Sequence, residues 1–424
     1  MSKQRKPEAR TRREFMSSSV KGASLLSMAS YAPSFLQQTV NAQNLAPSSD
    51  QKILVIVQMA GGNDGLNTVI PFEDDAYYSR RPNLAQKKYH QLGDYTGLNL
   101  ACPEMHKMYE NDEMAVIQNV GYPNPNRSHF RATDIYEMGS LKGRTGWVGR
   151  YLDAACPNTA SQKQPVAVNM GKSIPMTFWS MRTHNVYSKI SADDTLMETA
   201  AVDKNMLGDK ETLGLLKDSI KLSSKMDHST AAYLSSSFMD ALVSKEKMDA
   251  IFDSYRPGKA YKGGGFGKSL EHVAALIAKG LPTRVYYTKI GGFDTHADQA
   301  QRHGKLLAHM SGAIGSFYDD LKSKGLDKQV TTMAFSEFGR RIDENGSNGT
   351  DHGTVAPMFV FGPNVNGGVY GGGNIKLADC GGDLPFNQEV GTDFRQVYTT
   401  VLENWMGANS SKMFDKKYEA MSFI

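Results

Sequence analysis

The sequence contains little cysteine. Three cysteines occur in 424 residues, Cys102, Cys156 and Cys380, and no two of them stand in a Cys-x-x-Cys spacing. This distribution excludes a zinc–thiolate cluster and a dithiol redox motif as the basis of function. One disulfide with one thiol left over is compatible with the sequence, which determines neither the pairing nor the oligomeric state.

Long hydrophobic runs are also lacking. The stretch at 20–36 (VKGASLLSMASYAPSFL) is interrupted by polar residues, and it is too short and too polar to cross a bilayer. No later run reaches the length of a membrane-spanning helix. We therefore expect no stable membrane span in the mature protein.

Excess positive charge is absent once the N-terminus is set aside. Residues 1–42 carry seven basic and two acidic side chains, so the formal net charge of +4 becomes about −1 for the rest of the chain. No basic stripe or aromatic-interleaved basic patch follows. The composition therefore predicts no nucleic-acid partner.

The N-terminus has the pattern of a twin-arginine signal. Arg12 and Arg13 precede Phe15, the moderately apolar stretch follows, and VNA at 40–42 offers a small-residue cleavage site. We expect a signal peptide at 1–42, a linker at 43–51, and export through the twin-arginine translocation machinery to the periplasm or beyond. The alternative is an ordinary basic N-terminus with a helix behind it.

The remainder predicts one α/β domain over 52–424. Short apolar runs at 53–59, 113–120, 284–290, 330–335 and 358–361 indicate strands, and helical patterns lie at 146–156, 269–280, 297–324 and 389–407. We expect a doubly wound, mostly parallel sheet with helices on both faces. The Gly-rich run 262–267 is expected to be a turn, and the Gly-rich run 364–373 (NVNGGVYGGG) is expected to be a hairpin or loop. Residues 175–260, rich in Ser, Lys, Met and Asp, are expected to form a helical insertion.

Metal-binding residue types follow most of the predicted strands. Because the carboxyl ends of parallel strands line one crevice, these residues are expected to meet there and hold a divalent metal. The predicted ligands are Asp64, Asp294, His296, Glu337, Asp351 and His352. Asp294 and His296 are two residues apart, so an extended backbone would direct both to the same side.

The run at 113–120 leads to Ser128 and His129, at the junction of a Pro-rich loop and a helix. A serine hydroxyl at this position is a candidate nucleophile, because helix-terminal amides hold an anionic substrate nearby. Arg127 is a candidate partner for the substrate's oxygens. Each residue also has an ordinary interpretation: Ser128 as a helix cap, Asp64 as a turn residue, and Glu337 as an ion-pair partner of a nearby arginine. Because metal-binding residue types occur at the ends of several predicted strands, a shared metal site is favoured over these separate interpretations.

Several motifs together resemble the twin-arginine-exported domain-of-unknown-function family 1501. They are GGNDGLNTVIP (61–71), GYPNPNRSHFRATDI (121–135), GWVGRYLD (146–153), GGFDTH (291–296), FSEFGRR (335–341), GTDHGTVAP (349–357) and TDFRQVY (392–398). The resemblance implies an alkaline phosphatase-like fold, since the family is grouped by fold with the alkaline phosphatase, sulfatase and cofactor-independent phosphoglycerate mutase superfamily. That superfamily uses two metals and a Ser, Thr or formylglycine nucleophile.

The superfamily pattern carries over in part. Asp64, Ser128 and His352 match in order and context, whereas His296 follows Asp294 at an altered spacing. Glu337 is followed by Phe338, where the pattern has an imidazole. A shortened, carboxylate-rich set favours calcium, magnesium or manganese over a full two-zinc site, and leaves the number of metals open. The sulfatase Cys-x-Pro-x-Arg motif is absent.

Two hypotheses follow for the function. The first is an exported, metal-dependent hydrolase of phosphate or sulfate esters, acting on a small-molecule or polymer-borne substrate. The alternative is a non-catalytic exported binding or assembly protein that retains the fold with a degenerate metal site. Metal content and activity on esters discriminate between them.

Overall fold

The structure is a computed structural model, and it describes residues 51–156, 165–171, 173–182, 184, 186–188, 248–372, 375–386 and 391–424. The predicted signal peptide and nearly all of the linker lie outside these ranges, as does most of the predicted helical insertion. One compact unit comprises residues 44–188 and 251–424. The description below concerns that unit.

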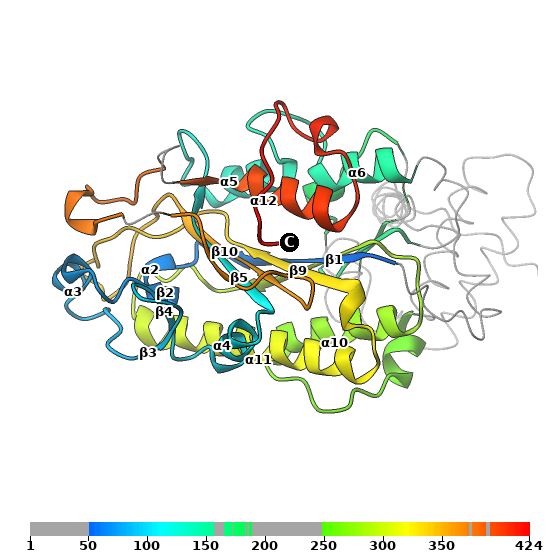
Figure 1. Cartoon of the computed structure of the whole chain (residues 1–424), viewed down its shortest axis with the longest axis horizontal. Helices are drawn as coiled ribbons and strands as arrows, with labels where there is room; N and C mark the ends of the chain where they lie inside the picture. The colour runs from blue at the N-terminus through cyan, green and yellow to red at the C-terminus, as the bar shows by residue number, and fades with distance from the viewer. Residues whose placement is uncertain are drawn as a thin grey trace, which may run out of the picture. The chain divides into compact units, whose positions relative to one another are not determined.

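A nine-stranded sheet forms its centre (Figure 1). In the described part of the chain the strand order is β11-β5-β10-β9-β1-β8-β6-β7, and β12 also pairs with β5. The bounds are β1 (Ile53–Ala60), β5 (Met114–Gly121), β6 (Ala167–Asn169), β7 (Val186–Ser188), β8 (Val285–Gly291), β9 (Val330–Phe335), β10 (Ala356–Phe361), β11 (Gly368–Tyr370) and β12 (Thr392–Asp393). A smaller antiparallel sheet contains β2 (Val69–Ile70), β4 (Gly97–Asn99) and β3 (Tyr89–Gln91).

One strand of the large sheet runs against the others. β10 is antiparallel to both β5 and β9, whereas every other pairing in this sheet is parallel. The carboxyl ends of β1, β5, β8 and β9 therefore lie at the same edge as the amino end of β10. Residues that follow those four strands and residues that precede β10 are brought to one place.

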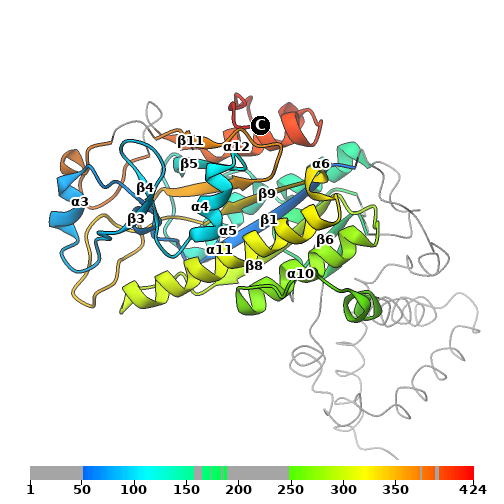
Figure 2. The same ribbon diagram turned by 60° about the horizontal axis from the view of Figure 1, so that its bottom comes forward.

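Helices cover both faces of the sheet, which confirms the predicted fold class (Figures 1 and 2). α4 (Pro103–Glu110), α10 (Gly264–Ala278) and α11 (Gln299–Ser323) lie on one face; α5 (His129–Met138), α6 (Trp147–Ala155) and α12 (Phe394–Thr400) lie on the other. Short helices α2 (Gly65–Thr68) and α3 (Asp75–Arg80) adjoin the small sheet, and a π-helical turn, Val401–Trp405, extends α12. The 3₁₀ turns are Met176–Phe178, Asp327–Gln329, Leu377–Asp379 and Ser410–Lys412.

Burial explains these elements. The apolar side chains of β1 from Ile53 to Met59 are at most 2% exposed, as expected for a parallel strand covered by helices on both faces. Along α11, Leu307, Met310, Ile314 and Phe317 recur at helical spacing and are fully buried. In α12 the Asp393 carboxylate accepts the Arg395 amide, and a full capping box fixes the start of the helix.

Three local expectations differ from the structure. α10 begins at Gly264, inside the run expected to be a turn. β7 lies within the range expected to be a helical insertion, yet it pairs in parallel with β6. β11 occupies part of a Gly-rich segment expected to be a hairpin or loop, and it pairs with β5. β7 and β11 are strands because they pair with neighbouring strands of the sheet. Local composition does not reveal such pairing.

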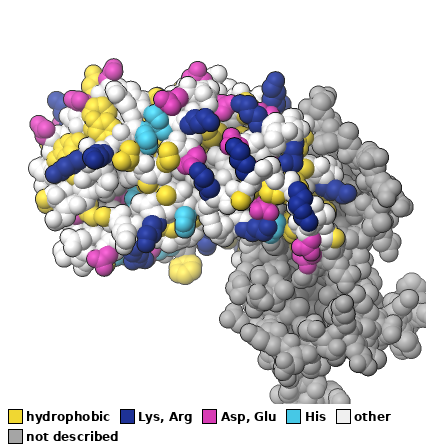
Figure 3. Space-filling view, turned by 90° about the horizontal axis from the view of Figure 1, so that it is seen from below, with side chains coloured by type: hydrophobic (Ala, Val, Ile, Leu, Met, Phe, Trp, Pro, Cys, Tyr) yellow, Lys and Arg dark blue, Asp and Glu magenta, His cyan; other side chains and the backbone are white. Residues whose placement is uncertain are grey.

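The face that carries α10 and α11 shows interspersed basic and acidic side chains (Figure 3). Among the described residues, no helix combines the length and apolar character that crossing a membrane requires.

Candidate functional site

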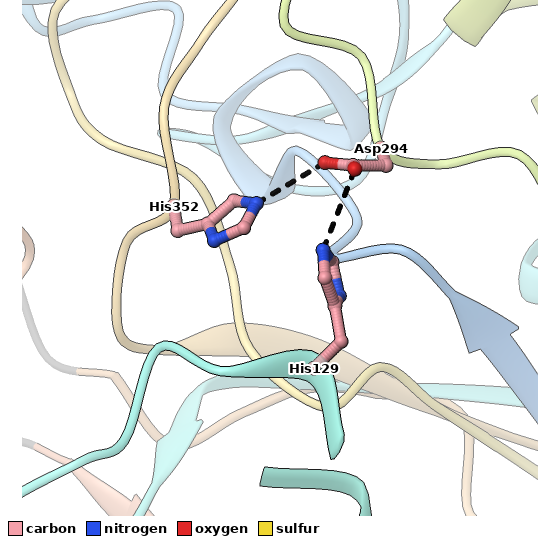
Figure 4. A group of neighbouring side chains, drawn as sticks. All are labelled: His129, Asp294 and His352. Atoms are coloured by element: carbon pink, nitrogen blue, oxygen red, sulfur yellow. Dashed lines mark hydrogen bonds and ion pairs between the residues drawn. The ribbon is translucent and has the colours of Figure 1, made fainter. Parts of the chain in front are cut away.

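A cluster of imidazoles and carboxylates lies at the sheet edge where four strands end and β10 begins. His129 comes from the start of α5, Asp294 and His296 from the loop after β8, and His352 from the loop before β10. Figure 4 shows His129 and His352 pointing toward the Asp294 carboxylate from different segments. The Asp294 side chain is 48% exposed, so the cluster is open to solvent.

Hydrogen bonds in the preceding loop fix the start of α5. The Asn126 amide donates to the Tyr122 hydroxyl at 2.9 Å, and the Ser128 amide donates to Asn126 Oδ1 at 2.8 Å. The second bond is an Asx-type turn, which orients the chain just before the helix. His129 is the first residue of α5, so this turn directs its side chain to the cluster.

Donor atoms converge on both oxygens of Asp294. His296 Nε2 and His352 Nε2 each lie 3.1 Å from Oδ1, and 2.9 Å from one another. His129 Nε2 lies 3.5 Å from Oδ2. Separations near 3 Å are those of atoms that share one metal ion, because ligand bonds of about 2.0–2.2 Å place neighbouring donor atoms roughly that far apart.

Each imidazole is held from behind through its other nitrogen. His129 Nδ1 lies 2.8 Å from Glu337 Oε1, His296 Nδ1 lies 3.2 Å from Asp351 Oδ1, and His352 Nδ1 lies 3.0 Å from the Arg127 carbonyl. An oxygen acceptor at Nδ1 selects the tautomer whose Nε2 is unprotonated. In its neutral form, each of the three rings therefore presents an Nε2 lone pair toward Asp294.

The protonation states of Asp294 and His352 agree with this arrangement. Burial of the Asp294 carboxyl opposes ionisation, but its polar partners, Arg340 foremost, outweigh burial and lower the pKa to about 2. Burial lowers the pKa of His352, which favours its neutral form. Since a carbonyl only accepts, neutral His352 must donate from Nδ1 to Arg127 and cannot also donate to Asp294. Lone pairs then face lone pairs, an arrangement that a bound cation would stabilise.

The pKa of His129 is shifted in the opposite direction to that of His352. Its hydrogen bond to Glu337 raises the pKa of the imidazole, against the effect of burial. His129 Nε2 and Glu337 Oε2 are both buried without a hydrogen-bond partner. A carboxylate behind a histidine that faces a metal is a recurrent arrangement, which fixes the ring and raises its basicity. His129, Asp294 and His352 together could hold one ion.

Two predicted ligands lie behind imidazoles. Glu337 is 2% exposed, and its Oε1 also accepts the Gly61 amide at 2.8 Å. Asp351 is exposed, and its Oδ1 accepts from Asn345 Nδ2 at 3.2 Å as well as contacting His296. The hydrogen bond from Asn345, followed by the hydrogen bond and charge of His296, lowers the pKa of Asp351. Both carboxylates are placed to orient histidines.

The structure does not join Asp64 to the cluster. Its carboxylate is fully buried, and Arg81 Nη1 donates to both oxygens at 2.9 and 2.8 Å. The Gln299 amide group also donates to Oδ2, and the Asn67 amide donates to Oδ1 at 3.3 Å. Burial disfavours the charged form, yet the Arg81 charge and the hydrogen bonds from Arg81 and Gln299 contribute to a net lowering of the pKa of Asp64. The carboxylate is thus committed to protein partners.

The predicted catalytic pair is placed beside the cluster. Ser128 is the N-cap residue of α5, but its side chain makes no capping hydrogen bond. It stands between Arg127, whose carbonyl contacts His352, and His129. The Arg127 guanidinium forms an ion pair with Asp383, so in this structure it is engaged by protein rather than free for a substrate.

Two residues of the cluster lie outside the predicted set. His129 is not among the ligands predicted from the sequence, although its position directly after Ser128 at a strand-to-helix junction is a signal that points to it. Arg340 is buried and donates from Nη2 to Asp294 Oδ1 at 2.7 Å, and from Nε to the Gly62 carbonyl at 2.8 Å. It links the loops after β1 and β8.

The family described as "Protein of unknown function (DUF1501)" matches residues 115–413. No curated protein matches the chain significantly. Solved structures with a similar arrangement include a protein in the alkaline phosphatase superfamily from Vibrio parahaemolyticus, at 10% identity and a TM-score of 0.33, covering 85% of this chain and 71% of that one.

Two further solved structures are enzymes by name. The PsFucS1 sulfatase from Pseudoalteromonas sp. is 10% identical with a TM-score of 0.38, covering 96% of this chain and 74% of its own. The alkaline phosphatase from the Antarctic bacterium TAB5 is 10% identical with a TM-score of 0.31, covering 76% of this chain and 95% of its own. At such identities the likeness concerns the arrangement of the chain and not its activity.

Proposed function

We propose that this chain, which belongs to the DUF1501 family, is an exported metal-dependent hydrolase of phosphate or sulfate esters. The observation that carries the proposal is the arrangement of three histidines, each held at Nδ1 by an oxygen, with Nε2 near the Asp294 carboxylate. This arrangement supplies ligands to a divalent cation and leaves the cluster open to a substrate.

His129, Asp294 and His352 would hold one metal ion. His296 Nε2, 3.1 Å from Asp294 Oδ1, is a further imidazole at the site. Glu337 and Asp351 would orient His129 and His296. Because Asp64, Glu337 and Asp351 are not ligands in this arrangement, imidazoles outnumber carboxylates, and the donor set suits zinc or another imidazole-binding metal better than the hard metals expected from the sequence. A bound divalent metal would supply a Lewis acid at the ester oxygens and favour ionisation of a nearby hydroxyl.

Ser128 is the proposed nucleophile. Its hydroxyl loses a proton and its Oγ forms a bond to phosphorus or sulfur, while the bond to the ester oxygen breaks and the alcohol leaves after taking up a proton. Water then releases the acid and restores the serine. The amides at the start of α5 would stabilise the anionic substrate. Arg127 could bind substrate oxygens only after leaving Asp383.

One observation favours the alternative of a non-catalytic binding protein. Because Arg127 is paired with Asp383, the structure shows a cluster that could hold a metal without showing a guanidinium directed to a substrate. Such a protein would hydrolyse no ester, whether or not its degenerate site holds an ion.

The test uses full-length protein purified after export by its own host. Metal content is measured by mass spectrometry, and turnover is measured on aryl and alkyl phosphate and sulfate esters before and after chelation. Asp294→Asn and His352→Ala should lose the metal, with an effect larger than the roughly 10–100-fold cost of removing a supporting partner. His309→Ala, on an exposed part of α11, is the matched control. Metal in the wild type without turnover would support the binding protein, and absence of metal would contradict the metal-dependent hydrolase.

A further inference from the structure

We infer that Gln299 is a positioning residue: its side-chain amide fixes the two loops that carry the proposed metal ligands, with Asp64 as its anchor. This inference rests on the proposed metal site. It gives a role to Asp64, whose carboxylate is buried away from the cluster.

Gln299 is the first residue of α11 and is fully buried. Its Oε1 accepts the Thr295 hydroxyl at 3.0 Å and the Thr350 hydroxyl at 2.6 Å. Thr295 stands between Asp294 and His296, and Thr350 stands two residues before His352. One amide oxygen therefore joins the loop after β8 to the loop before β10.

The other end of the amide determines its orientation. Gln299 Nε2 donates to Asp64 Oδ2, and Asp64 is held by Arg81. Arg81 in turn donates from Nε to the Ile342 carbonyl at 2.7 Å. Because the carboxylate needs a donor and the two hydroxyls need an acceptor, only an amide satisfies all three partners at once. Glutamate would place a second carboxylate against Asp64.

A backbone bond and an arginine close the network. The Thr350 amide donates to the Thr295 carbonyl at 3.3 Å, and Arg340 Nη1 donates to the Thr350 carbonyl at 2.8 Å. Arg340 also contacts Asp294 directly. The network is buried beneath the cluster, so its bonds are expected to hold the 2.9–3.1 Å separations among Asp294, His296 and His352. Loss of one bond should loosen the separation of the ligands without removing a ligand.

The experiment compares Thr350→Val with Thr350→Ser. Valine keeps the shape of the side chain and removes the hydroxyl, whereas serine keeps the hydroxyl. The matched control is Thr331→Val in β9, because the Thr331 hydroxyl is buried without a hydrogen-bond partner. Zinc affinity of the full chain is measured by competition with a chromophoric chelator, and the melting temperature of each metal-free variant is measured in parallel.

Thr350→Val should weaken zinc binding by roughly 10–100-fold, the range found for partners that support a metal ligand. Thr350→Ser and Thr331→Val should bind as the wild type does. A melting temperature lowered equally in Thr350→Val and Thr350→Ser, with unchanged zinc affinity in both, would mean that Thr350 contributes only to folding and would overturn the inference.

Thr295→Val and Thr295→Ser repeat the comparison on the other loop and decide the matter if Thr350→Val does not fold. Equal zinc affinity in Thr295→Val, Thr295→Ser and the wild type would overturn the inference while leaving the proposed function intact. A wild type that binds no zinc or other divalent metal would overturn the proposed function, and this inference with it.

Discussion

Asp294 has an unusual set of neighbours for a half-exposed carboxylate. A buried arginine and three imidazole nitrogens lie within 3.5 Å of its oxygens. Arg340 pairs with the carboxylate within the structure, and each histidine directs Nε2 toward it. The residue therefore links the loop network beneath the cluster to the positions that would hold a metal.

Ser128→Ala separates the proposed nucleophile from a helix cap. The Ser128 side chain makes no capping hydrogen bond, so alanine should cost less than the roughly 0.5–2 kcal/mol of a functional cap. Metal content should be unchanged, because the histidines keep their own anchors. Ester turnover should fall to background, since the covalent route is removed. Turnover equal to the wild type, measured alongside metal content and urea unfolding, would show that a water attacks instead.

At the residue scale, the sequence identified the chemical types at the site better than their roles. Asp294, His296 and His352 were predicted from their positions beside strands, and the structure brings them together. Asp64 has the same sequence context, but Arg81, which lies 17 residues further on, occupies its carboxylate. No local pattern reports such a pairing, because it depends on where α3 packs.

At the scale of elements, the critical feature is the close approach of the backbone after β1 to the loop after β8. Gly61 adopts a φ of +121°, and a Cβ there would lie 2.3 Å from the Asp294 amide nitrogen. Its own amide donates to Glu337 at 2.8 Å. Only glycine permits this close approach of two strand ends.

Gly61→Ala should therefore disturb both stability and the site. A left-handed alanine costs on the order of 1–3 kcal/mol, and the clash displaces Asp294 in addition. The free energy of unfolding from urea titration should fall by at least that amount, and metal affinity should fall with it. Gly291→Ala is the control, because a Cβ there meets nothing within 4 Å. Equal stability of the two variants would contradict the close approach.

A buried chain of hydrogen bonds attaches α5 to the sheet. The Tyr287 hydroxyl lies 3.0 Å from Gln58 Oε1 and 2.9 Å from Glu137 Oε1, and the Met176 amide donates to Glu137 Oε2 at 2.7 Å. A single tyrosine proton cannot serve two acceptors. If Glu137 is protonated, it donates to Tyr287 and Tyr287 donates to Gln58. Burial raises the pKa of Glu137 above its ordinary value of 4.5, in agreement with this pattern.

This network predicts a pH-dependent contribution to stability. The unfolded chain releases the Glu137 proton near pH 4.5 and the folded chain releases it at higher pH, so this contribution is complete below 4.5 and declines as the pH rises through the raised pKa. Each unit of difference corresponds to about 1.4 kcal/mol. Glu137→Gln reproduces the donor and acceptor of the protonated acid. Relative to the wild type, it should gain stability between pH 5 and pH 8 in urea titrations; a constant difference would refute the protonated state.

The sequence predicted the long elements well for a physical reason. Strands buried on both faces read as continuous apolar runs, so β1, β5, β8 and β9 could be located to within about a residue. β7 and β11 have three residues each, too few to display a pattern, and their pairing partners are distant in sequence. α10 begins within a glycine-rich run because its later apolar positions are buried, which outweighs poor helix propensity in the first turn.

At the scale of the whole molecule, the proposed export signal and the compact unit that carries the cluster are different parts of the sequence. Residues 44–188 and 251–424 contain the sheet and the cluster, while the paired arginines lie outside the described residues. A change in the arginine pair should therefore alter the destination of the protein without altering metal binding or turnover. Export and chemistry can be tested independently in one set of variants.

Arg12→Lys combined with Arg13→Lys should leave the precursor uncleaved in the cytoplasm, because the translocation receptor reads the guanidinium pair and not the charge alone. Fractionation with immunoblotting measures the shift from mature to precursor length. Arg5→Lys combined with Arg10→Lys is the control, since it makes the same substitutions in the same basic segment outside the pair. The control should be exported as the wild type is.

Periplasmic accumulation of the Arg12/Arg13 variant at the level of the control would show that the N-terminus is not a twin-arginine signal. The substrate would then no longer need to be an ester outside the cytoplasm. The proposal of a metal site at the sheet edge would be unaffected.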